Sequence, residues 1–319
     1  MNLRIGSRGS QLALWQANHI ADRLRHQGHT VALEIIKTTG DRLQEVTVAQ
    51  VGSKGMFTKE IEEALAEGRV DLAVHSLKDL PTELPEGFAL AATPQRVDPR
   101  DVFVSLKYAD LAALPAGAKV GTSSQRRRAQ LKELRPDVEA VEFRGNVDTR
   151  LRKLSEGQVE AILLAAAGLD RLEKTEWVRQ RLDPKDFCPA AGQGSLGIET
   201  RLGDEETLTA LAFLDDATTR YAVSAERAAL ATLGGGCQVP IGIHCRACVD
   251  DGANPEDAYW EIFGVVASPE TGQTVRAYHS VPRTHTDAVA LGRSMAEMLI
   301  AEGAGNLLAG VAPDAGGAA

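Results

Sequence analysis

One cysteine lies in a glycine-rich setting, the segment TLGGGCQVP at residues 232–240. Three glycines precede Cys237 directly, and Gln-Val-Pro follows it. Glycines let the backbone enter steep turns and let other atoms approach closely, at an entropic cost that a merely packed cysteine would not need. The pattern therefore predicts that a reacting group reaches the sulfur of Cys237.

A carboxylate occupies a second chemically suggestive position, in the segment AVHSLKDLPTELP at residues 73–85. A hydrophobic strand ends in Ser76, and Lys78 and Asp79 then follow in a proline-stiffened loop. Active sites of α/β proteins lie at such carboxyl ends of strands. Asp79 is suited to act as an acid, a base or a stabiliser of positive charge. A plain surface loop remains the alternative, and His75 is expected to be packed rather than catalytic.

Arginines accompany two helix starts that share one design. In IGSRGS (5–10) and GTSSQRRR (121–128) a strand ends in small hydroxyl residues that open a helix. The amide groups and the dipole at such a terminus attract anions, and arginine forks suit carboxylates or phosphates. Arg8, Arg126 and Arg127 are the candidates for anion contacts.

Further basic residues strengthen this interpretation. The segment FRGNVDTRLRK (143–153) places Arg144 at a strand end and Arg150 in the following helix. Between residues 119 and 153 ten Lys or Arg stand against five Asp or Glu, in a chain whose net charge is -9. This local reversal predicts an anionic ligand, with capped helices and solvated basic faces as the alternative.

The segment GSKGMFTKE (52–60) has glycines on both sides of Lys54 and carries Phe57 and Lys59. We interpret it as a lid that brings ammonium groups and an aromatic face over a ligand, although an ordinary surface loop fits the same residues.

The other thiols give weaker signals. Cys245 and Cys248 have a spacing found in metal sites, but zinc needs four ligands. Their odd separation also places them on opposite faces of a strand. We expect Cys188, Cys245 and Cys248 to be structural or incidental thiols, and we expect no metal.

The elements that must position these residues follow an α/β pattern. A strand at 3–7 leads through the helix cap Ser10 to a helix at about 11–27 that Gly28 ends, with Leu12, Trp15, Ile20 and Leu24 on one apolar stripe. Further strands are expected at 31–39, 70–76, 118–123, 138–143 and 161–167, with helices at about 59–67, at 124–134 and through Leu151. This alternation predicts two units with mostly parallel sheets.

A smaller α+β region is expected after Thr218. It comprises a helix at about 219–233, strands near 239–247, 259–267 and 274–282, and a helix from 286 to about 302 that turns Val289, Gly292, Ala296 and Leu299 to one face.

Composition limits the class of protein. The chain of 319 residues is 44% hydrophobic and 25% charged, so two or three globular domains are expected. No apolar run has the length of a membrane span, the first residues lack the apolar core of a signal peptide, and four cysteines are too few for a disulfide scaffold. We therefore expect a cytoplasmic protein with no membrane association.

Seven segments together resemble the porphobilinogen deaminase (hydroxymethylbilane synthase) family, which joins four porphobilinogen units head to tail in tetrapyrrole biosynthesis. They are IGSRGSQLALWQA, VGSKGMFTKE, DLAVHSLKDLP, VGTSSQRRRAQL, FRGNVDTRL, PAAGQGSLGIE and GGGCQVPIG. The resemblance extends from about residue 3 to residue 302, and it implies porphobilinogen as substrate. We expect a monomer, since nothing in the sequence demands a partner subunit.

The resemblance also implies roles for individual residues. Cys237 would carry a dipyrromethane cofactor through a thioether, and Asp79 would be the catalytic carboxylate. The implied cofactor contacts are Ser76, Lys78, Thr122, Ser123, Arg126, Arg127 and Arg144. The implied substrate contacts are Arg8, Gln16, Arg144, Arg150 and Arg171, with Lys54, Phe57 and Lys59 in a lid.

The fold implied by the family has three domains. Two α/β lobes resemble those of periplasmic binding proteins, and a small α+β domain carries the cysteine. The expected boundaries are 1–95 with 194–215, then 96–193, then 216–305, with a disordered tail at 306–319.

Two other classes of function compete with this interpretation. A noncatalytic two-lobe protein that binds an anionic small molecule would use the same arginines but would need no thiol in a glycine loop. A nucleic-acid-binding protein would need stacking aromatics, whereas aromatics are 4% of the chain and Phe143 is the one aromatic in the basic stretch.

Overall fold

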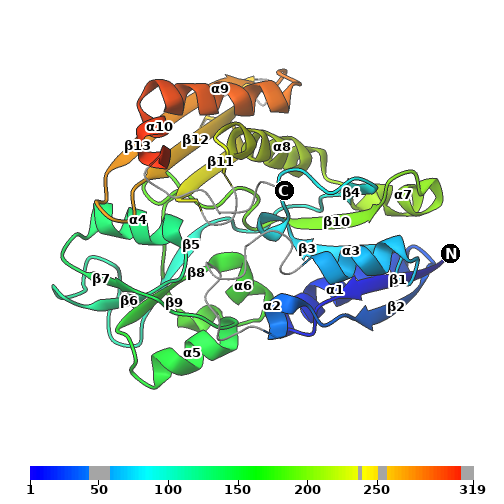
Figure 1. Ribbon diagram of the computed structural model, residues 1–319, viewed down its shortest axis with the longest axis horizontal. Helices are drawn as coiled ribbons and strands as arrows, with labels where there is room; N and C mark the ends of the chain where they lie inside the picture. The colour runs from blue at the N-terminus through cyan, green and yellow to red at the C-terminus, as the bar shows by residue number, and fades with distance from the viewer. Residues whose placement is uncertain (43–57, 236–238, 251–256, 310–319) are drawn as a thin grey trace, which may run out of the picture. The chain divides into compact units, whose positions relative to one another are not determined.

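The computed structural model describes residues 1–42, 58–235, 239–250 and 257–309 (Figure 1). The chain divides into two compact units, one combining residues 1–97 with 195–220 and the other combining residues 98–194 with the described residues from 221 onward. We call the first unit lobe 1. In the second unit we call residues 98–194 lobe 2 and residues 221–309 the C-terminal domain.

Lobe 1 is built on a five-stranded sheet. Its strands are β1 (Asn2–Ser7), β2 (Thr30–Ile35), β3 (Leu72–Ser76), β4 (Phe88–Ala92) and β10 (Leu196–Arg201). Its helices are α1 (Gln11–His26), α2 (Thr39–Arg42), α3 (Lys59–Ala66) and α7 (Glu205–Leu211), with 3₁₀ turns η2 (Leu77–Asp79) and η4 (Ala212–Leu214). The strand order is β2-β1-β3-β10-β4, in which β10 alone runs opposite to its neighbours.

The first helix of lobe 1 starts as its sequence predicts. The Ser10 hydroxyl accepts a hydrogen bond from the Ala13 N–H at 3.3 Å, and Gly28 takes a left-handed φ of 84° just after the helix ends. α1 packs on the sheet through Ala17, Ile20, Ala21 and Leu24, while α3 packs on a separate cluster around Ile61 and Leu65. The two clusters position the ends of β1 and β3 beside the start of α1.

Lobe 2 repeats this architecture. Its strands are β5 (Asp101–Val104), β6 (Lys119–Gly121), β7 (Glu139–Val141), β8 (Ala161–Ala165) and β9 (Val178–Arg181). Its helices are α4 (Gln125–Leu134), α5 (Val147–Ser155) and α6 (Ala166–Arg171), with the 3₁₀ turn η3 (Thr175–Trp177). The order is β7-β6-β8-β5-β9, and β5 alone runs opposite to its neighbours.

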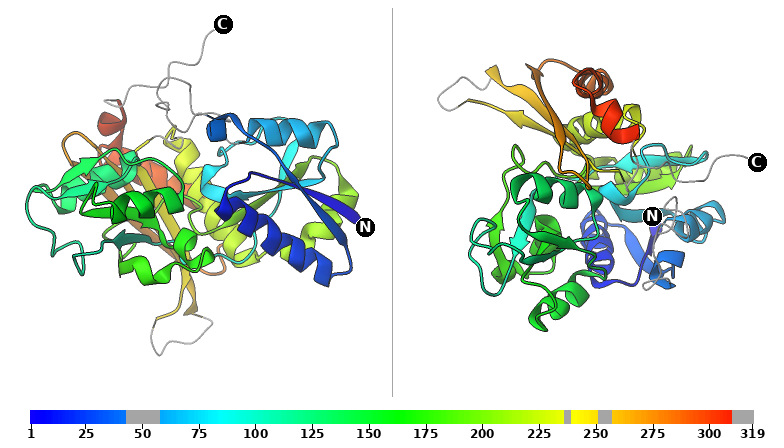
Figure 2. Two further views of the ribbon diagram at one scale, coloured as in Figure 1. Left: turned by 90° about the horizontal axis from the view of Figure 1, so that it is seen from below. Right: turned by 60° about the vertical axis from the view of Figure 1, so that its left-hand side comes forward.

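The C-terminal domain is a three-stranded antiparallel sheet with helices on one face (Figure 2). Its helices are α8 (Ala217–Thr232), α9 (Ala288–Ala301) and α10 (Ala304–Ala309), and its strands are β11 (Ile241–Cys248), β12 (Tyr259–Ala267) and β13 (Thr274–Pro282). The first four residues of α8 belong to the unit of lobe 1. Ile243, Ile262, Val266, Met295 and Leu299 belong to the core between the sheet and these helices.

The predicted fold class, two mostly parallel α/β lobes with a small α+β domain, is confirmed, since four strands of each five-stranded sheet share one direction. No helix in the described ranges is long and apolar enough to cross a bilayer. The domain boundaries remain a prediction. In the expected tail, residues 306–309 are instead helical in α10, because Leu307 and Leu308 pack on the core of the C-terminal domain.

Two predicted helix faces are wrong in part. Leu12 and Trp15 are only half-buried, since Leu12 lines a pocket and Trp15 stacks on His19 at the surface, with ring centroids 5.0 Å apart. In α9, Val289 is exposed, and Leu291 and Met295 face the core together with Gly292 and Leu299.

Candidate active site

A small polar pocket lies in lobe 1 beside the start of α1 and the end of β3. Its volume is about 80 Å³. Its polar lining consists of Arg8, Ser10, Gln16, Thr58, His75, Ser76 and Asp79, with Leu12, Ala13, Ile61 and Val74 as apolar lining. The Gln16 side-chain amide donates a 2.8 Å hydrogen bond to the Ser76 hydroxyl, which ties the helix to the strand end. Residues 60 apart in sequence thus form one wall.

The backbone of the pocket's carboxylate is fixed although its side chain is exposed. Asp79 ends the turn η2, between the buried side chains of Leu77 and Leu80. The Leu77 N–H donates to the Ser195 carbonyl at 3.0 Å. Beneath the turn, a Cβ on Gly197 would lie 2.9 Å from a Leu77 methyl and 3.0 Å from a Leu80 methyl, so glycine at this position lets both leucines pack closely on β10. The Asp79 carboxylate is therefore presented to solvent on a rigid support.

A buried histidine–glutamate contact adjoins the pocket. The His75 Nε2 and Glu199 Oε2 atoms are 2.9 Å apart, and both side chains are buried. His75 is packed, as expected, and its catalytic role is not tested by this burial. Nearby, burial raises the pKa of Glu62, and the Glu199 charge raises it further. Glu199 gave no signal in the sequence, because its partner is 124 residues away.

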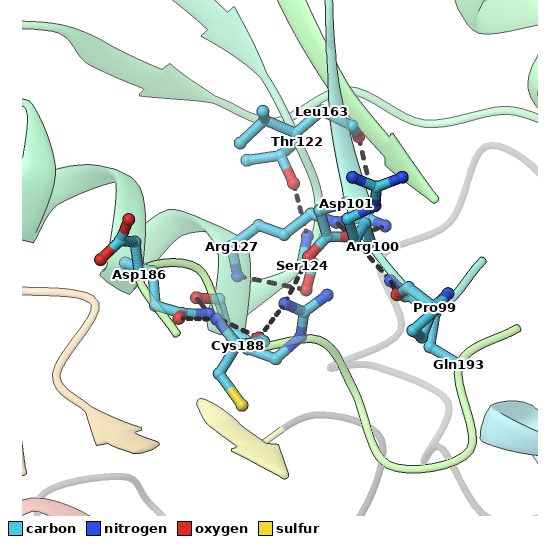
Figure 3. A network of polar contacts seen from close by, with 12 residues as sticks. Pro99, Arg100, Asp101, Thr122, Ser124, Arg127, Leu163, Asp186, Cys188 and Gln193 are labelled. Carbon is cyan, nitrogen blue, oxygen red and sulfur yellow. Dashed lines mark hydrogen bonds and ion pairs between the residues drawn. The ribbon is translucent and has the colours of Figure 1, made fainter. Parts of the chain in front are cut away.

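Lobe 2 holds its predicted arginines around one buried carboxylate (Figure 3). Arg126 Nη1 lies 2.6 Å from Asp101 Oδ2, while Arg127 Nε and Nη2 lie 2.9 Å and 2.7 Å from Asp101 Oδ1. Arg126 is 5% exposed, Arg127 is 6% exposed and Asp101 is fully buried. Gln193 Nε2 donates to Asp101 Oδ1 at 3.0 Å. Asp101 and Gln193 are thus site residues that the sequence interpretation missed.

Charge sets the protonation of this cluster. Burial by itself raises the pKa of Asp101, but Arg126 and Arg127 outweigh it and hold that pKa well below its ordinary value. Burial lowers the pKa of Arg127, and Arg126 adds to this, while Asp101 opposes it. The carboxylate stays ionised, and the three groups retain one excess positive charge.

Two further predicted arginines lie in lobe 2, where Arg171 is buried and Arg150 is half-buried. Burial lowers the pKa of Arg150 to about 10, and the positive charge of Arg127 adds to the effect. The Arg150 Nε atom is buried without a hydrogen-bond partner among the described residues. Burial also lowers the pKa of Arg171 to about 10, and Arg171 Nη2 donates to the Gly194 carbonyl at 2.8 Å. An anionic group would relieve this accumulated positive charge.

The hydroxyl and surface residues of the prediction are distributed around this cluster. The Thr122 and Ser123 hydroxyls accept backbone N–H groups of Ser124 and Phe143 at 3.2 Å and 3.3 Å, at the end of β6. Arg144 is about one-third exposed and donates to Glu142 Oε1 at 2.6 Å. The Thr122 hydroxyl therefore shapes the start of α4, the Ser123 hydroxyl contacts the segment after β7, and Arg144 keeps an accessible guanidinium.

Other predicted residues are not assembled with these groups. Lys59 is exposed and lies 4.0 Å from Glu63 on α3, and Lys78 is half-buried; neither lines the lobe 1 pocket. Cys237, Lys54 and Phe57 lie outside the described residues. Gly234, just before the cysteine segment, has a left-handed φ of 67° that ends α8.

The remaining cysteines have little chemical reactivity. Burial raises the pKa of Cys188 to about 12 and that of Cys248 to about 11, and Cys245 is buried. Among the described residues, no group of three or more His, Cys, Asp or Glu side chains is arranged to hold a metal ion.

Comparison with known proteins decides the family. Residues 3–209 match the family model "Porphobilinogen deaminase, dipyromethane cofactor binding domain", and residues 220–301 match "Porphobilinogen deaminase, C-terminal domain". The chain belongs to the porphobilinogen deaminase family. Members of this family are transferases of tetrapyrrole synthesis, with porphobilinogen as substrate and a dipyrromethane cofactor.

Individual porphobilinogen deaminases are similar in sequence to this chain over nearly its whole length. The porphobilinogen deaminase of Trichlorobacter lovleyi is 50% identical over 303 residues, which cover 94% of each chain. That of Roseiflexus castenholzii is 48% identical over 311 residues, which cover 97% of this chain and 99% of the relative. A solved structure of the methionine-binding protein MetQ is 12% identical, with a TM-score of 0.44 over 67% of this chain and 89% of MetQ. That likeness is too low to carry an argument.

Proposed function

We propose that the chain catalyses the stepwise condensation of four porphobilinogen molecules on a covalently bound dipyrromethane, followed by hydrolytic release of the linear tetrapyrrole hydroxymethylbilane. Family membership over residues 3–301 is the observation that carries the proposal. The lobe 1 pocket and the lobe 2 arginine cluster supply the two kinds of group that this reaction needs.

Asp79 is the proposed catalytic residue. Each round expels ammonia from the substrate's aminomethyl group and leaves an electron-poor cation whose charge extends to the pyrrole nitrogen. An exposed carboxylate on a rigid turn can accept the pyrrole N–H and stabilise that charge without reorganising. The same oxygen atoms can carry the proton that the departing amine takes up.

The lobe 2 arginines are proposed to hold the cofactor's carboxylates. When bound, the dipyrromethane supplies the pyrrole ring to which the first substrate unit is joined. Arg126 and Arg127 are already oriented by Asp101, and the buried excess charge on Arg127 and Arg150 fits acetate and propionate groups. Thr122 and Ser123 at the end of β6, together with Ser76, Lys78 and Arg144, complete the proposed cofactor contacts.

Substrate contacts are proposed for the accessible and half-buried polar groups. Arg8 and Gln16 line the lobe 1 pocket, where a carboxylate of porphobilinogen would pair with the Arg8 guanidinium. Arg144, Arg150 and Arg171 would take carboxylates of the lengthening chain. Lys54, Phe57 and Lys59 remain the proposed lid.

Intact-protein mass spectrometry tests the proposal. We expect the purified chain to be heavier than its sequence by one dipyrromethane, with the added mass on the peptide that contains Cys237. The Cys237→Ser variant should lack this mass and all activity, while Cys248→Ser, a control thiol in the same domain, should keep both. An active chain without added mass would contradict the proposal.

The alternative is a noncatalytic binding protein for an anionic small molecule, favoured by the same buried arginines. Incubation with porphobilinogen separates the two functions, because only the enzyme releases ammonia and a linear tetrapyrrole. The cytoplasmic location, the monomeric state and the absence of nucleic-acid binding expected from the sequence remain predictions.

A further inference from the structure

A second and larger pocket lies in the unit formed by lobe 2 and the C-terminal domain. Its volume is about 440 Å³, within the range of small-molecule sites. Its walls are Lys185 and Cys188 from the segment after β9, Phe263 and Gly264 from β12, and Arg276, Ala277 and Tyr278 from β13. None of these residues belongs to the lobe 1 pocket or to the arginine cluster around Asp101.

The aromatic wall of this pocket offers a flat apolar surface. Phe263 and Tyr278 are neighbours across β12 and β13, with ring centroids 5.7 Å apart and an interplanar angle of 27°. Tyr278 is 50% exposed, although a large aromatic side chain gains free energy by burial. The exposed ring face is a suitable stacking surface for a planar ligand.

The charged wall carries an excess of positive charge. Arg276 is balanced by Glu133, with Arg276 Nη2 2.6 Å from Glu133 Oε2. Arg246, whose guanidinium carbon lies 5.5 Å from the centre of the Phe263 ring, is paired with Glu261. Lys185 Nζ lies 5.8 Å from the same ring centre, and no described carboxylate forms an ion pair with it. One ammonium group beside an aromatic shelf therefore remains for a ligand.

The floor of the pocket is held in place from behind. The Cys188 N–H donates to Gln130 Oε1 at 2.7 Å, and its carbonyl accepts Gln130 Nε2 at 3.0 Å and Arg126 Nη1 at 2.6 Å. The thiol points away from these contacts (Figure 3). Because this floor is fixed in advance, a ligand would bind without ordering it.

We propose that this pocket binds a small planar aromatic carboxylate, with its ring on Tyr278 and Phe263 and its carboxylate on Lys185. Aromatic stacking and one charge-assisted hydrogen bond are the interactions that the pocket offers. Cys188 lines the pocket, and its carbonyl accepts a hydrogen bond from Arg126, a proposed cofactor-binding residue. A bound ligand would therefore contact a residue that helps to position Arg126.

Isothermal titration calorimetry of the full-length holoprotein with indole-3-carboxylate tests this inference. We expect saturable binding of one molecule per chain, at least fivefold weaker binding in Lys185→Met and in Tyr278→Ala, and unchanged binding in Lys107→Met, an exposed lysine elsewhere in lobe 2. The neutral analogue indole-3-carboxamide should bind at least fivefold more weakly than the carboxylate.

Several results would overturn the inference. These are the absence of saturable binding up to millimolar probe, equal affinity for the carboxylate and the amide, or equal affinity in wild type, Lys185→Met and Tyr278→Ala. Thermal melting of each variant shows whether it is folded. The intact mass shows that the cofactor is still attached, so a failure of this inference leaves the proposed function untouched.

Discussion

Lobes 1 and 2 have the same sheet topology but use it differently. In each sheet three parallel strands are followed by one antiparallel strand and then an edge strand, and in each lobe a serine caps the helix after a parallel strand. The equivalent strand pairs are β3 with β10 in lobe 1 and β8 with β5 in lobe 2. The residue pairs at the ends of these strands differ, and one of the differences is a carboxylate.

At the end of β3, Ser76 is paired with Leu196, the first residue of β10. At the end of β8, Ala165 is paired with Asp101, the first residue of β5. A carboxylate at this position in lobe 2 allows two arginines to be buried beside it. In lobe 1 the same position is Leu196, and the carboxylate of the nearby pocket is the exposed Asp79. The comparison teaches that one backbone design carries a buried arginine–carboxylate cluster in lobe 2 and a small pocket with an exposed carboxylate in lobe 1.

The largest expected effect is on activity and arises in lobe 1. Asp79→Asn should lower kcat by about 10²- to 10⁴-fold, because the amide can neither carry a proton nor balance a cation. The melting temperature should change little, since the side chain is exposed. Steady-state kinetics and calorimetric melting measure both, with the nearby exposed Glu86→Gln as control. A normal kcat in Asp79→Asn would remove the assigned role.

The next effect is on stability and arises in lobe 2. Asp101→Asn should lower the free energy of unfolding by about 3–5 kcal/mol, because Arg126 and Arg127 would remain buried without their carboxylate. Urea denaturation measures the change. Asp22→Asn is the matched control, since it breaks an exposed pair in which Arg25 Nη1 lies 2.8 Å from Asp22 Oδ1, and it should cost under about 1 kcal/mol. Equal losses in both variants would show that burial does not distinguish the two pairs.

The same carboxylate predicts a pH dependence. Because folding lowers the pKa of Asp101, its stabilising contribution is fully present above its ordinary pKa of about 4 and is lost as pH falls further toward the folded-state value. The difference in unfolding free energy between wild type and Asp101→Asn should be constant between pH 6 and 8 and shrink below about pH 4. A difference that grows on acidification would refute this assignment.

The smallest effects should be equal in the two lobes. The Ser10 hydroxyl caps α1, and the Ser124 hydroxyl accepts the Arg127 N–H at 3.4 Å to cap α4. Ser10→Ala and Ser124→Ala should each lower the free energy of unfolding by about 1 kcal/mol. The same urea measurement compares them. A much larger loss for Ser124→Ala would mean that the cap also holds the arginine cluster together.

Local sequence patterns predicted the elements better than the contacts. The cap at Ser10, the helix start near residue 124 and the three strands of the C-terminal domain follow from patterns within about ten residues, and the structure has them. No strand is predicted at β5 or β10, the antiparallel strands in the fourth position of each sheet, because their pairing partners are distant in sequence. The local sequence pattern likewise gives no sign that the chain returns to lobe 1; that expectation comes from the family resemblance alone.

The candidate site shows the same limit. Arg126 and Arg127 were recognised by their position at a helix start, but Asp101 lies 25 residues earlier, in a polar and proline-containing stretch. A buried arginine pair requires a carboxylate nearby, so the sequence could have predicted that Arg126 and Arg127 have an acidic partner. It does not say which acidic residue answers the requirement, because that depends on strand pairing.

The position of β10 in the sequence decides which of the two sheets can be completed first during synthesis. Because β10 pairs with both β3 and β4, lobe 1 lacks its inner strand until residue 201 has been synthesised, whereas the lobe 2 sheet ends with Arg181. At ribosomal rates this leaves two apolar strand edges unpaired for on the order of ten seconds. A chain truncated after residue 190 should therefore be cut by proteases within lobe 1 and resist them within lobe 2. The lobe that is translated first therefore completes its sheet after the lobe that follows it.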